Sequence, residues 1–222
     1  MPEQNVYDVM RTLKAVRRLR PDPIPDAVLD RVLEAATWAP TGGNRQPWRM
    51  IVVKDRARKQ RLGELYSLSW KEYSKRYRQL PAEIPSEVRE RMERTYRSGD
   101  YLASHFGDLP VVVVFCFNPK EMAITDAKLG RPSVVGGGSV YPSVQNLLLA
   151  CRAEGLGCVL TTLLCEHEPE VRELLAIPQP WGTAATIPIG YPVGRGHGPL
   201  QRRRVSELAF LDSWDRPLAP GR

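Results

Sequence analysis

The sequence predicts one domain in which helices pack around a buried β-sheet, and three observations lead to this prediction. Apolar residues recur at helical spacing in residues 6–16, 28–36 and 140–151, which is typical of amphipathic helices. Residues 111–117 are apolar on both alternating faces, which indicates a strand covered on both sides. Residues 49–54 and 184–191 are further stretches of strand length and composition. A chain of 222 residues without an internal linker or repeat can build one full core.

The composition fits a globular protein without a targeting or membrane segment. Hydrophobic residues make up 42% of the chain and charged residues 26%, which is ordinary for a soluble domain. No apolar run approaches the ~20 residues that span a bilayer. The first five residues lack the basic and then apolar pattern of a secretion signal. We therefore expect a cytoplasmic protein without a membrane partner.

The cysteines and the net charge limit which metal sites, ligands and partners we expect. Cys116, Cys151, Cys158 and Cys165 lie in apolar runs without metal-ligand spacing, so we expect reduced core thiols and no metal site. The net charge of +7 comes mostly from arginine, with a dense run at residues 202–204. Such a charge fits a nucleic-acid surface, an anionic ligand or a basic solvated face. No nucleic-acid-binding motif accompanies it, so we expect no nucleic-acid partner and keep that class as the weaker alternative.

The N-terminal part is expected to form two helices joined by an extended passage. The apolar stripe of the first helix runs to Val16, so Lys14 and Arg17 share a face near its end. Three prolines between residues 21 and 25 then exclude helix. Asp26 is expected to cap the second helix.

A candidate binding loop follows the second helix. It reads Ala39-Pro40-Thr41-Gly42-Gly43-Asn44-Arg45-Gln46-Pro47-Trp48. Small residues let backbone N–H groups approach a ligand closely, and the amides of Asn44 and Gln46 both donate and accept, which suits the edge of a heterocycle. The alternative is an ordinary helix-to-strand turn, because these residue types are common in turns.

Residues 55–104 are expected to form a helical excursion rather than a core layer. The segment is rich in Arg, Glu, Lys and Tyr, and Pro81 and Pro85 divide it into two helices. One interpretation is a solvated helical pair. The other is a mobile lid that presents Tyr66, Trp70 and Tyr73 to a ligand.

The second half of the chain supplies a buried helix and two strands. Glycines 136–138 precede the helix and favour close packing over a phosphate loop, because the P-loop and Rossmann patterns are absent. Gly155 is expected to end that helix in a left-handed conformation. A strand carrying Thr161 and Thr162 is expected over residues 157–164. In the last strand, Pro188 argues against a fully paired central position.

Basic and polar clusters from distant parts of the chain can serve one anionic cofactor. Lys14 with Arg17, and the late arginine run, can bracket a phosphate, while Thr161 and Thr162 can meet the reactive centre. Nucleophile and metalloprotease motifs are absent. We therefore assign no catalytic side chain and expect the cofactor to carry the reaction.

Several stretches resemble the FMN-dependent nitroreductase family. They are residues 14–25, residues 39–48 with the element Asn-x-Gln-Pro-Trp, residues 145–147 with 155–157, residues 177–178, residues 187–192 and the late basic run. This resemblance implies an α+β fold with a central, mostly antiparallel sheet flanked by helices, assembled as an intertwined homodimer. It also implies FMN at the subunit interface and a C-terminal arm, residues 198–222, that reaches the partner.

The resemblance further implies which residues bind FMN. Lys14, Ala15 and Arg17 would contact the phosphate, ribityl chain and flavin, and the loop after the second helix would approach from the other subunit. A positive charge near flavin N1 stabilises the negative charge of the reduced ring. The cofactor-binding residues expected in total are Lys14, Ala15, Arg17, Pro40, Thr41, Gly42, Asn44, Gln46, Thr161, Thr162, Leu163, Arg202, Arg203 and Arg204.

The implied activity is electron transfer from NAD(P)H through flavin N5 to nitroaromatic or quinone-type acceptors. The sequence departs from the common pattern of the family at two places, which bears on this activity. Leu13-Lys14-Ala15 stands where many members have Arg-Arg-Ser, and Thr161-Thr162-Leu163-Leu164 stands where many have Pro-x-Glu-Gly. The threonines are similar to the dehalogenating branch of the family. The alternatives are therefore a reductive dehalogenase, or a protein that stores or occludes flavin with little turnover.

Overall fold

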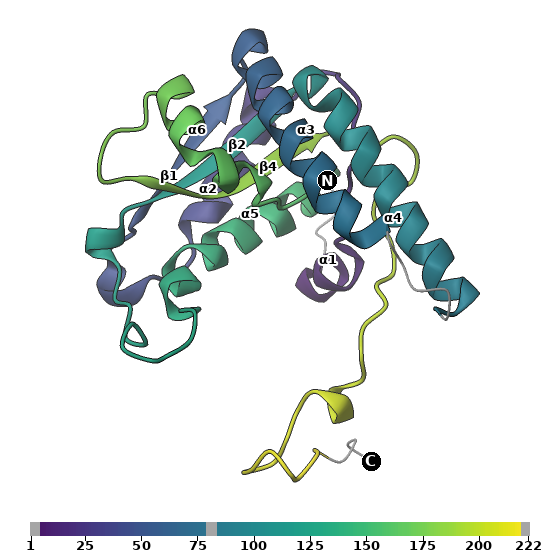
Figure 1. Ribbon diagram of the computed structural model, residues 1–222, viewed down its shortest axis with the longest axis vertical. Helices are drawn as coiled ribbons and strands as arrows, with labels where there is room; N and C mark the ends of the chain where they lie inside the picture. The colour runs from purple at the N-terminus through teal and green to yellow at the C-terminus, as the bar shows by residue number, and fades with distance from the viewer. Residues whose placement is uncertain (1–4, 79–83, 219–222) are drawn as a thin grey trace.

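The computed structural model describes residues 5–78 and 84–218. A four-stranded antiparallel sheet lies at its centre, with helices on both faces (Figure 1). The α+β class predicted from the sequence is thus confirmed. Within the described ranges, no helix has the length and apolar character needed to cross a membrane.

The sheet is built from β1 (Trp48–Val53), β2 (Val111–Phe117), β3 (Gly157–Cys158) and β4 (Gly182–Gly190), in the order β1-β2-β4-β3. Side chains of β2 alternate between two cores: Val112 and Val114 enter one, Val113 and Phe115 the other. This confirms the prediction that the run is covered on both sides. β1 begins and ends one residue earlier than predicted.

One face of the sheet carries α2 (Asp26–Thr37) and α5 (Tyr141–Ala153), which run antiparallel to each other. The Ser143 hydroxyl donates to the carbonyl of Ala36 at 2.8 Å, and Arg31 forms an ion pair of 2.7 Å with Glu154. The C-terminal end of α2 therefore lies beside the N-terminal end of α5. Gly155 follows α5 with φ +75°, as predicted.

The other face carries α3 (Arg56–Arg78), α4 (Ser86–His105) and α6 (Glu168–Leu174). Leu62, Leu65 and Tyr66 of α3 are at most 2% exposed and belong to the core on this face. The expectation that residues 55–104 lie outside the core layer is therefore wrong for α3. Its many charged residues cover only the outer side. Pro85 is the N-cap of α4, whereas Pro81 lies outside the described residues.

The first helix, α1 (Val6–Thr12), is shorter than the periodicity predicted. Leu13 is already extended, and the following residues run along the sheet: the N–H of Val16 donates to the carbonyl of Cys158 at 2.8 Å, and Leu19 pairs with Pro192. Strand-like pairing outweighs the helical pattern here. Lys14 and Arg17 thus lie on an extended segment and do not share a helix face.

The strand predicted over residues 157–164 breaks after Cys158. Thr161 returns to the sheet through a bridge with Thr186, and Leu163–His167 forms a 3₁₀ helix. Thr161 therefore lies in an isolated bridge beyond a short strand, and Thr162 lies between this bridge and the 3₁₀ helix.

β4 lies centrally, between β2 and β3, but it is not fully paired at Pro188, because β3 pairs only with Ile189 and Gly190, as the proline predicts. Thr186 exchanges backbone hydrogen bonds with Thr161, so Pro188, two residues further, faces the same edge. The hydrogen-bond ladder between β3 and β4 covers Ile189 and Gly190 and does not include Pro188. The N–H that proline lacks is therefore not needed.

The C-terminal arm extends away from the sheet and helices (Figure 1). Within it, Leu218 donates to the carbonyl of Ala209 at 2.8 Å, and the rings of Phe210 and Trp214 stack with centroids 4.9 Å apart. Exposed apolar side chains on the arm are Val205, Leu208, Leu211, Trp214 and Leu218. Clustered apolar exposure of this kind marks an interaction surface.

Candidate active site

The candidate site is a cleft of about 980 Å³ between the segment after α1, the helix α4 and the start of the C-terminal arm. Of the residues predicted from the sequence, it brings together Lys14, Ala15 and Arg202. Arg91 and Thr95 of α4 line it too, and sequence reasoning missed both. None of the described residues that line this cleft is acidic. Three cations without a carboxylate favour an anionic ligand.

The position of Lys14 is fixed through its backbone. Its N–H donates to Nδ1 of His197 at 3.3 Å, and Nε2 of His197 lies 2.8 Å from the carbonyl oxygen of Leu156. Accepting at Nδ1 and donating at Nε2 requires the neutral imidazole with its hydrogen on Nε2. His197 thereby ties the cleft wall to the start of β3. No motif in the sequence marks this histidine.

We expect the fold to lose stability as the pH falls below about 6.5, the ordinary pKa of histidine. Burial lowers the pKa of His197, and the positive charge of Arg152 lowers it further. The hydrogen bond to the carbonyl of Leu156 acts in the opposite direction. The unfolded chain then binds a proton more readily than the folded one. Protonation therefore favours unfolding, from the unfolded pKa down to the lower pKa of the folded state, and the loss levels off below that.

Urea unfolding at about pH 7.5 and about pH 5.5, on either side of the histidine pKa, measures this effect. The free energy of unfolding should fall less between the two pH values in His197→Gln than in the wild type. The control is His105→Gln, at an exposed histidine, and it should keep the wild-type difference. Equal differences in all three proteins would contradict a role for His197.

Arg17 and Thr161 both influence the pKa of the buried Tyr66. Burial raises the pKa of Tyr66, while the positive charge of Arg17 and the hydroxyl of Thr161 oppose that rise. Val16 pairs with Cys158 of β3, and Thr161 pairs with Thr186 of β4 beyond the end of β3, so Arg17 and Thr161 both lie on the β3 side of the sheet.

Thr161, Thr162 and Leu163 are consecutive but have different surroundings. The Thr161 side chain is buried, and its hydroxyl accepts from the N–H of Leu163 at 3.3 Å. Thr162 is exposed and lines a second cavity of about 510 Å³. The carbonyl of Leu163 accepts from the hydroxyl of Ser69 on α3 at 3.2 Å. Thr162 is thus the one of the three whose side chain reaches open space.

The loop of residues 40–46 is held in a fixed shape by its own side chains. The N–H of Gln46 donates to the Thr41 hydroxyl at 3.0 Å, and the Gln46 amide donates to Oδ1 of Asn44 at 3.1 Å. Asn44 and Gln46 have φ of 53° and 50°, a conformation that is costly for residues other than glycine. Pro40, Asn44 and Gln46 are exposed. Backbone strain in an exposed, amide-bearing loop is typical of ligand contacts.

Within one chain, this loop and the cleft lie at opposite ends of α5. The N–H of Gly42 donates to the hydroxyl of Ser139, just before α5. Near the other end of the helix, Nε of Arg152 donates to the hydroxyl of Thr12, two residues before Lys14. A helix rises 1.5 Å per residue, so the 13 residues of α5 separate loop and cleft by about 18 Å. A single chain does not bring Lys14 and Asn44 together.

Of the late arginines, Arg202 is the one that reaches the cleft with Lys14. Arg203 and Arg204 lie beyond it on the arm and are exposed. The N–H of Arg204 donates to the carboxylate of Glu207 at 3.1 Å.

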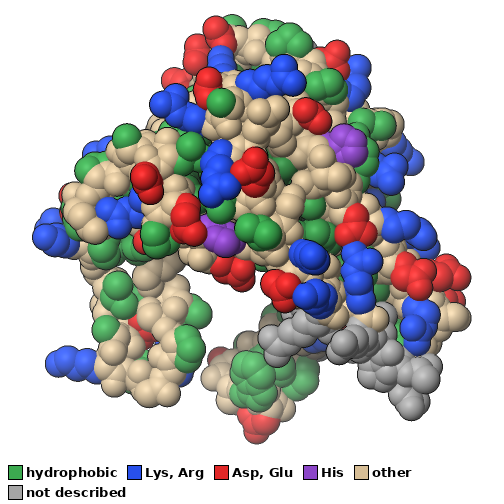
Figure 2. Space-filling model, turned by 45° about the horizontal axis from the view of Figure 1, so that its top comes forward, with side chains coloured by type: hydrophobic (Ala, Val, Ile, Leu, Met, Phe, Trp, Pro, Cys, Tyr) green, Lys and Arg blue, Asp and Glu red, His purple; other side chains and the backbone are tan. Residues whose placement is uncertain are grey.

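The charges outside the cleft are mixed in sign. Figure 2 shows basic and acidic side chains side by side over the face that it draws. Ion pairs such as Arg61–Glu64 and Lys75–Glu72, both at 2.7 Å, account for part of this pattern. The cleft therefore differs from that face by its unbalanced positive charge.

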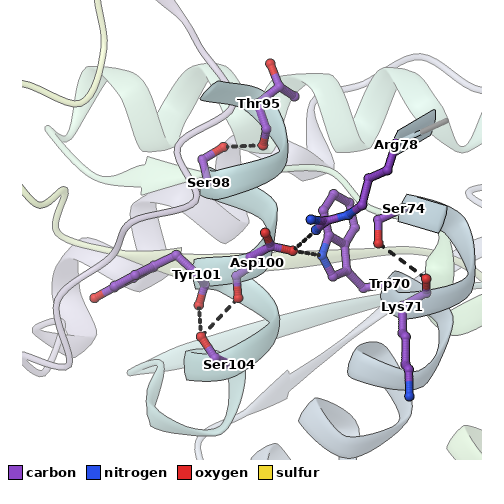
Figure 3. Close-up of polar contacts among 9 residues, drawn as sticks. All are labelled: Trp70, Lys71, Ser74, Arg78, Thr95, Ser98, Asp100, Tyr101 and Ser104. Atoms are coloured by element: carbon purple, nitrogen blue, oxygen red, sulfur yellow. Dashed lines mark hydrogen bonds and ion pairs between the residues drawn. The ribbon is translucent and has the colours of Figure 1, made fainter. Parts of the chain in front are cut away.

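Helix α4 is fixed against α3 by Trp70. The indole N–H donates to Asp100 at 2.9 Å, and Arg78 contacts the same carboxylate oxygen at 2.6 Å (Figure 3). A Cβ added to Gly99 would lie 2.2 Å from the indole ring, so only glycine fits there. Trp70 is 9% exposed, so the interpretation that it is presented to a ligand is wrong. It holds α4 as a wall of the cleft instead.

Comparison with known proteins places the chain in a family. The family model described as Nitroreductase family matches residues 11–191. The chain belongs to the nitroreductase family. An NADH dehydrogenase of Thermus thermophilus is 30% identical over 220 residues, covering 85% of this chain and 89% of that protein. Iodotyrosine deiodinase of Danio rerio is 27% identical over 209 residues, covering 94% of this chain and 67% of that protein.

Solved structures of nitroreductase-like proteins share the fold. A crystal structure of oxidised iodotyrosine deiodinase bound to FMN and 3-iodo-L-tyrosine superposes with a TM-score of 0.68 at 24% identity, covering 90% of this chain and 96% of that one. The family match of this nitroreductase chain includes Lys14, Asn44 and Thr161 but ends before His197 and Arg202. The contribution of these last two residues to the cleft rests on their geometry alone.

Proposed function

We propose that the protein is an FMN-dependent oxidoreductase that passes electrons from NAD(P)H to nitroaromatic or quinone-type acceptors. The observation that carries the proposal is the cleft in which Lys14 and Arg202 converge without an acidic neighbour. A solved relative with this fold is bound to FMN. When bound, FMN supplies the hydride and electron transfer, so the protein needs only to bind and orient.

Each of the gathered residues can be assigned to one part of FMN. Lys14 and Arg202 would hold the phosphate, because two cations match the charge of a phosphate dianion. Arg17, further along the edge, would lie beside the ring system and stabilise negative charge there. Of the two threonines, Thr162 would meet the ring with its side chain, because that of Thr161 is buried. None of these roles requires a side chain that donates or removes a proton.

We further propose that a second copy of the chain completes the site in a homodimer. The loop of residues 40–46 offers exposed amides but lies about 18 Å from the cleft of its own chain. The arm exposes five apolar side chains that its own chain leaves uncovered. Pairing of two chains would cover the arm and bring the loop of one copy to the cleft of the other.

Reconstitution of the purified apoprotein with FMN tests the function. We expect a yellow complex that sediments as a dimer and oxidises NADH or NADPH when a nitroaromatic or a quinone is present. A protein that takes up no FMN would overturn the proposal. A yellow protein that consumes almost no NAD(P)H would favour flavin storage instead.

Reductive dehalogenation is a second candidate, favoured by the likeness to iodotyrosine deiodinase and by the residues Thr161-Thr162. To distinguish dehalogenation from nitroaromatic reduction, the same holoprotein is reduced with dithionite and given 3-iodo-L-tyrosine. Release of iodide faster than reduction of a nitroaromatic would favour this candidate.

A further inference from the structure

The second cavity, of about 510 Å³, shares none of its described lining residues with the cleft, and phosphate binding leaves it unused. We propose that this cavity binds the electron acceptor and selects uncharged aromatic compounds. This inference rests on the proposed function and names the substrate class of the same site.

The cavity lies at the end of the site where the flavin ring is expected. Val140 and Tyr141, at the N-terminal end of α5, line it, whereas the cleft lies near the other end of this helix, about 18 Å away. FMN carries its phosphate and its ring at opposite ends, so a phosphate held in the cleft leaves the ring to extend toward the cavity. Thr162, the residue proposed to meet the ring with its side chain, lines the cavity directly. An acceptor bound here would therefore lie beside the ring and away from the phosphate.

The wall of the cavity is uncharged, as far as the described residues form it. Apolar side chains such as Phe117, Met122 and Ile124 make up much of it. Burial raises the pKa of both Tyr141 and Cys165, so these two groups stay uncharged at neutral pH. A charged ligand would lose its water here without gaining a partner, which is costly. The cavity therefore favours a neutral ligand.

Residues 118–140, which connect β2 to α5 (Figure 1), supply the outer wall of the cavity. Asp126 in this segment is buried, and its carboxylate accepts from the Ser133 hydroxyl at 2.6 Å and from Arg131 at 2.9 Å. These contacts hold the segment in place without a ligand. The cavity is thus formed in advance, as is usual for small-molecule sites.

The other hydroxyl groups of the wall are also bonded within the chain. The Tyr141 hydroxyl donates to the carbonyl of Ala184 at 3.2 Å, and the Thr183 hydroxyl donates to the carboxylate of Glu168 at 3.0 Å. Among the hydroxyls that line the cavity in the described ranges, only that of Thr162 is left to donate to a ligand. One donor beside an apolar wall suits an aromatic ring that carries a nitro or quinone oxygen.

The test compares three nitroaromatic acceptors of similar shape: neutral 4-nitrobenzamide, anionic 4-nitrobenzoate and cationic 4-nitrobenzylamine. The FMN-loaded wild type is photoreduced and mixed with each acceptor without NAD(P)H, so that the nitro group takes two electrons and two protons and becomes a nitroso group and water. The dependence of the reoxidation rate on acceptor concentration gives the dissociation constant of each acceptor. We expect that of the amide to be at least about 10-fold lower than those of the two charged compounds.

The variant Ile124→Lys adds a positive charge to the wall at an exposed side chain, so the core is spared. It should change the ratio of the benzoate and amide dissociation constants by about 10-fold in favour of the benzoate. The matched control is Leu129→Lys, which adds the same charge to an exposed apolar residue of the same segment that does not line the cavity. It should keep the wild-type ratio, and the FMN dissociation constant should not change in either variant.

Three results would overturn the inference while the proposed function stands. They are equal dissociation constants for the three acceptors in the wild type, equal changes of the ratio in the two lysine variants, and a loss of FMN affinity in Ile124→Lys. A wild-type protein that takes up no FMN would overturn both the inference and the proposed function.

Discussion

Replacing both Lys14 and Arg202 by glutamine should weaken FMN binding by about 10² to 10⁴-fold. In the proposed site each side chain would offer one charge-assisted contact to the phosphate, worth about 1.5–3 kcal/mol, and the two contacts would come from independent segments. The dissociation constant follows from quenching of FMN fluorescence during titration with the apoprotein. Each single variant should account for about half of the loss on a logarithmic scale.

The control for this loss is the double variant Arg61→Gln/Lys75→Gln. It removes the same two charges from exposed ion pairs on α3, so a general effect of net charge would affect it equally. We expect its FMN affinity to stay within about twofold of the wild type. If Arg203→Gln weakened binding more than Arg202→Gln, our choice of the inward arginine would be wrong.

Truncation of Trp70 to alanine should lower the free energy of unfolding by about 3–5 kcal/mol, as expected for a large buried aromatic side chain. The substitution leaves a cavity and also removes the indole N–H that Asp100 accepts. Urea unfolding of the apoprotein measures the loss without any cofactor. Leu68→Ala, on the same helix at a side chain 57% exposed, should stay within about 0.5 kcal/mol of the wild type.

A double-mutant cycle with Gly99 separates the packing contact from general damage. Gly99→Ala alone should destabilise by about 1–3 kcal/mol, because its Cβ collides with the indole ring. In the Trp70→Ala background the collision is absent, and alanine then gains up to about 1 kcal/mol from its higher helix propensity. Additive effects of the two substitutions would show that the ring and the glycine do not interact.

Local sequence signals are enough to predict the core of the fold and the position of the loop at residues 40–46, whose role in binding stays a prediction. The apolar run of β2 indicates its burial on both faces, and Gly155 marks the end of α5, because these features depend on neighbouring residues alone. The residues around Asn44 and Gln46 were singled out for their small size and their amides. The structure finds them exposed and held by bonds among themselves.

Features that depend on distant partners could not be predicted from the sequence. Residues 13–16 continue a helical pattern, yet they pair with β3, about 140 positions later in the chain. The many charged residues of α3 suggest a solvated helix, but its apolar side packs into the core. Arg91 is one of many basic residues in its segment, and nothing local distinguishes it. Its place in the cleft follows only from where α4 packs.

The pairing of Lys14 with His197 joins positions 183 residues apart, and this order of assembly has a consequence for synthesis. On a ribosome the segment with Lys14 emerges first, and its partner His197 emerges only when almost the whole polypeptide has been made. The proposed FMN site would therefore be complete only after translation. Any product cut short before His197 lacks the residue that fixes Lys14 and also lacks Arg202, so it could not form the proposed phosphate site.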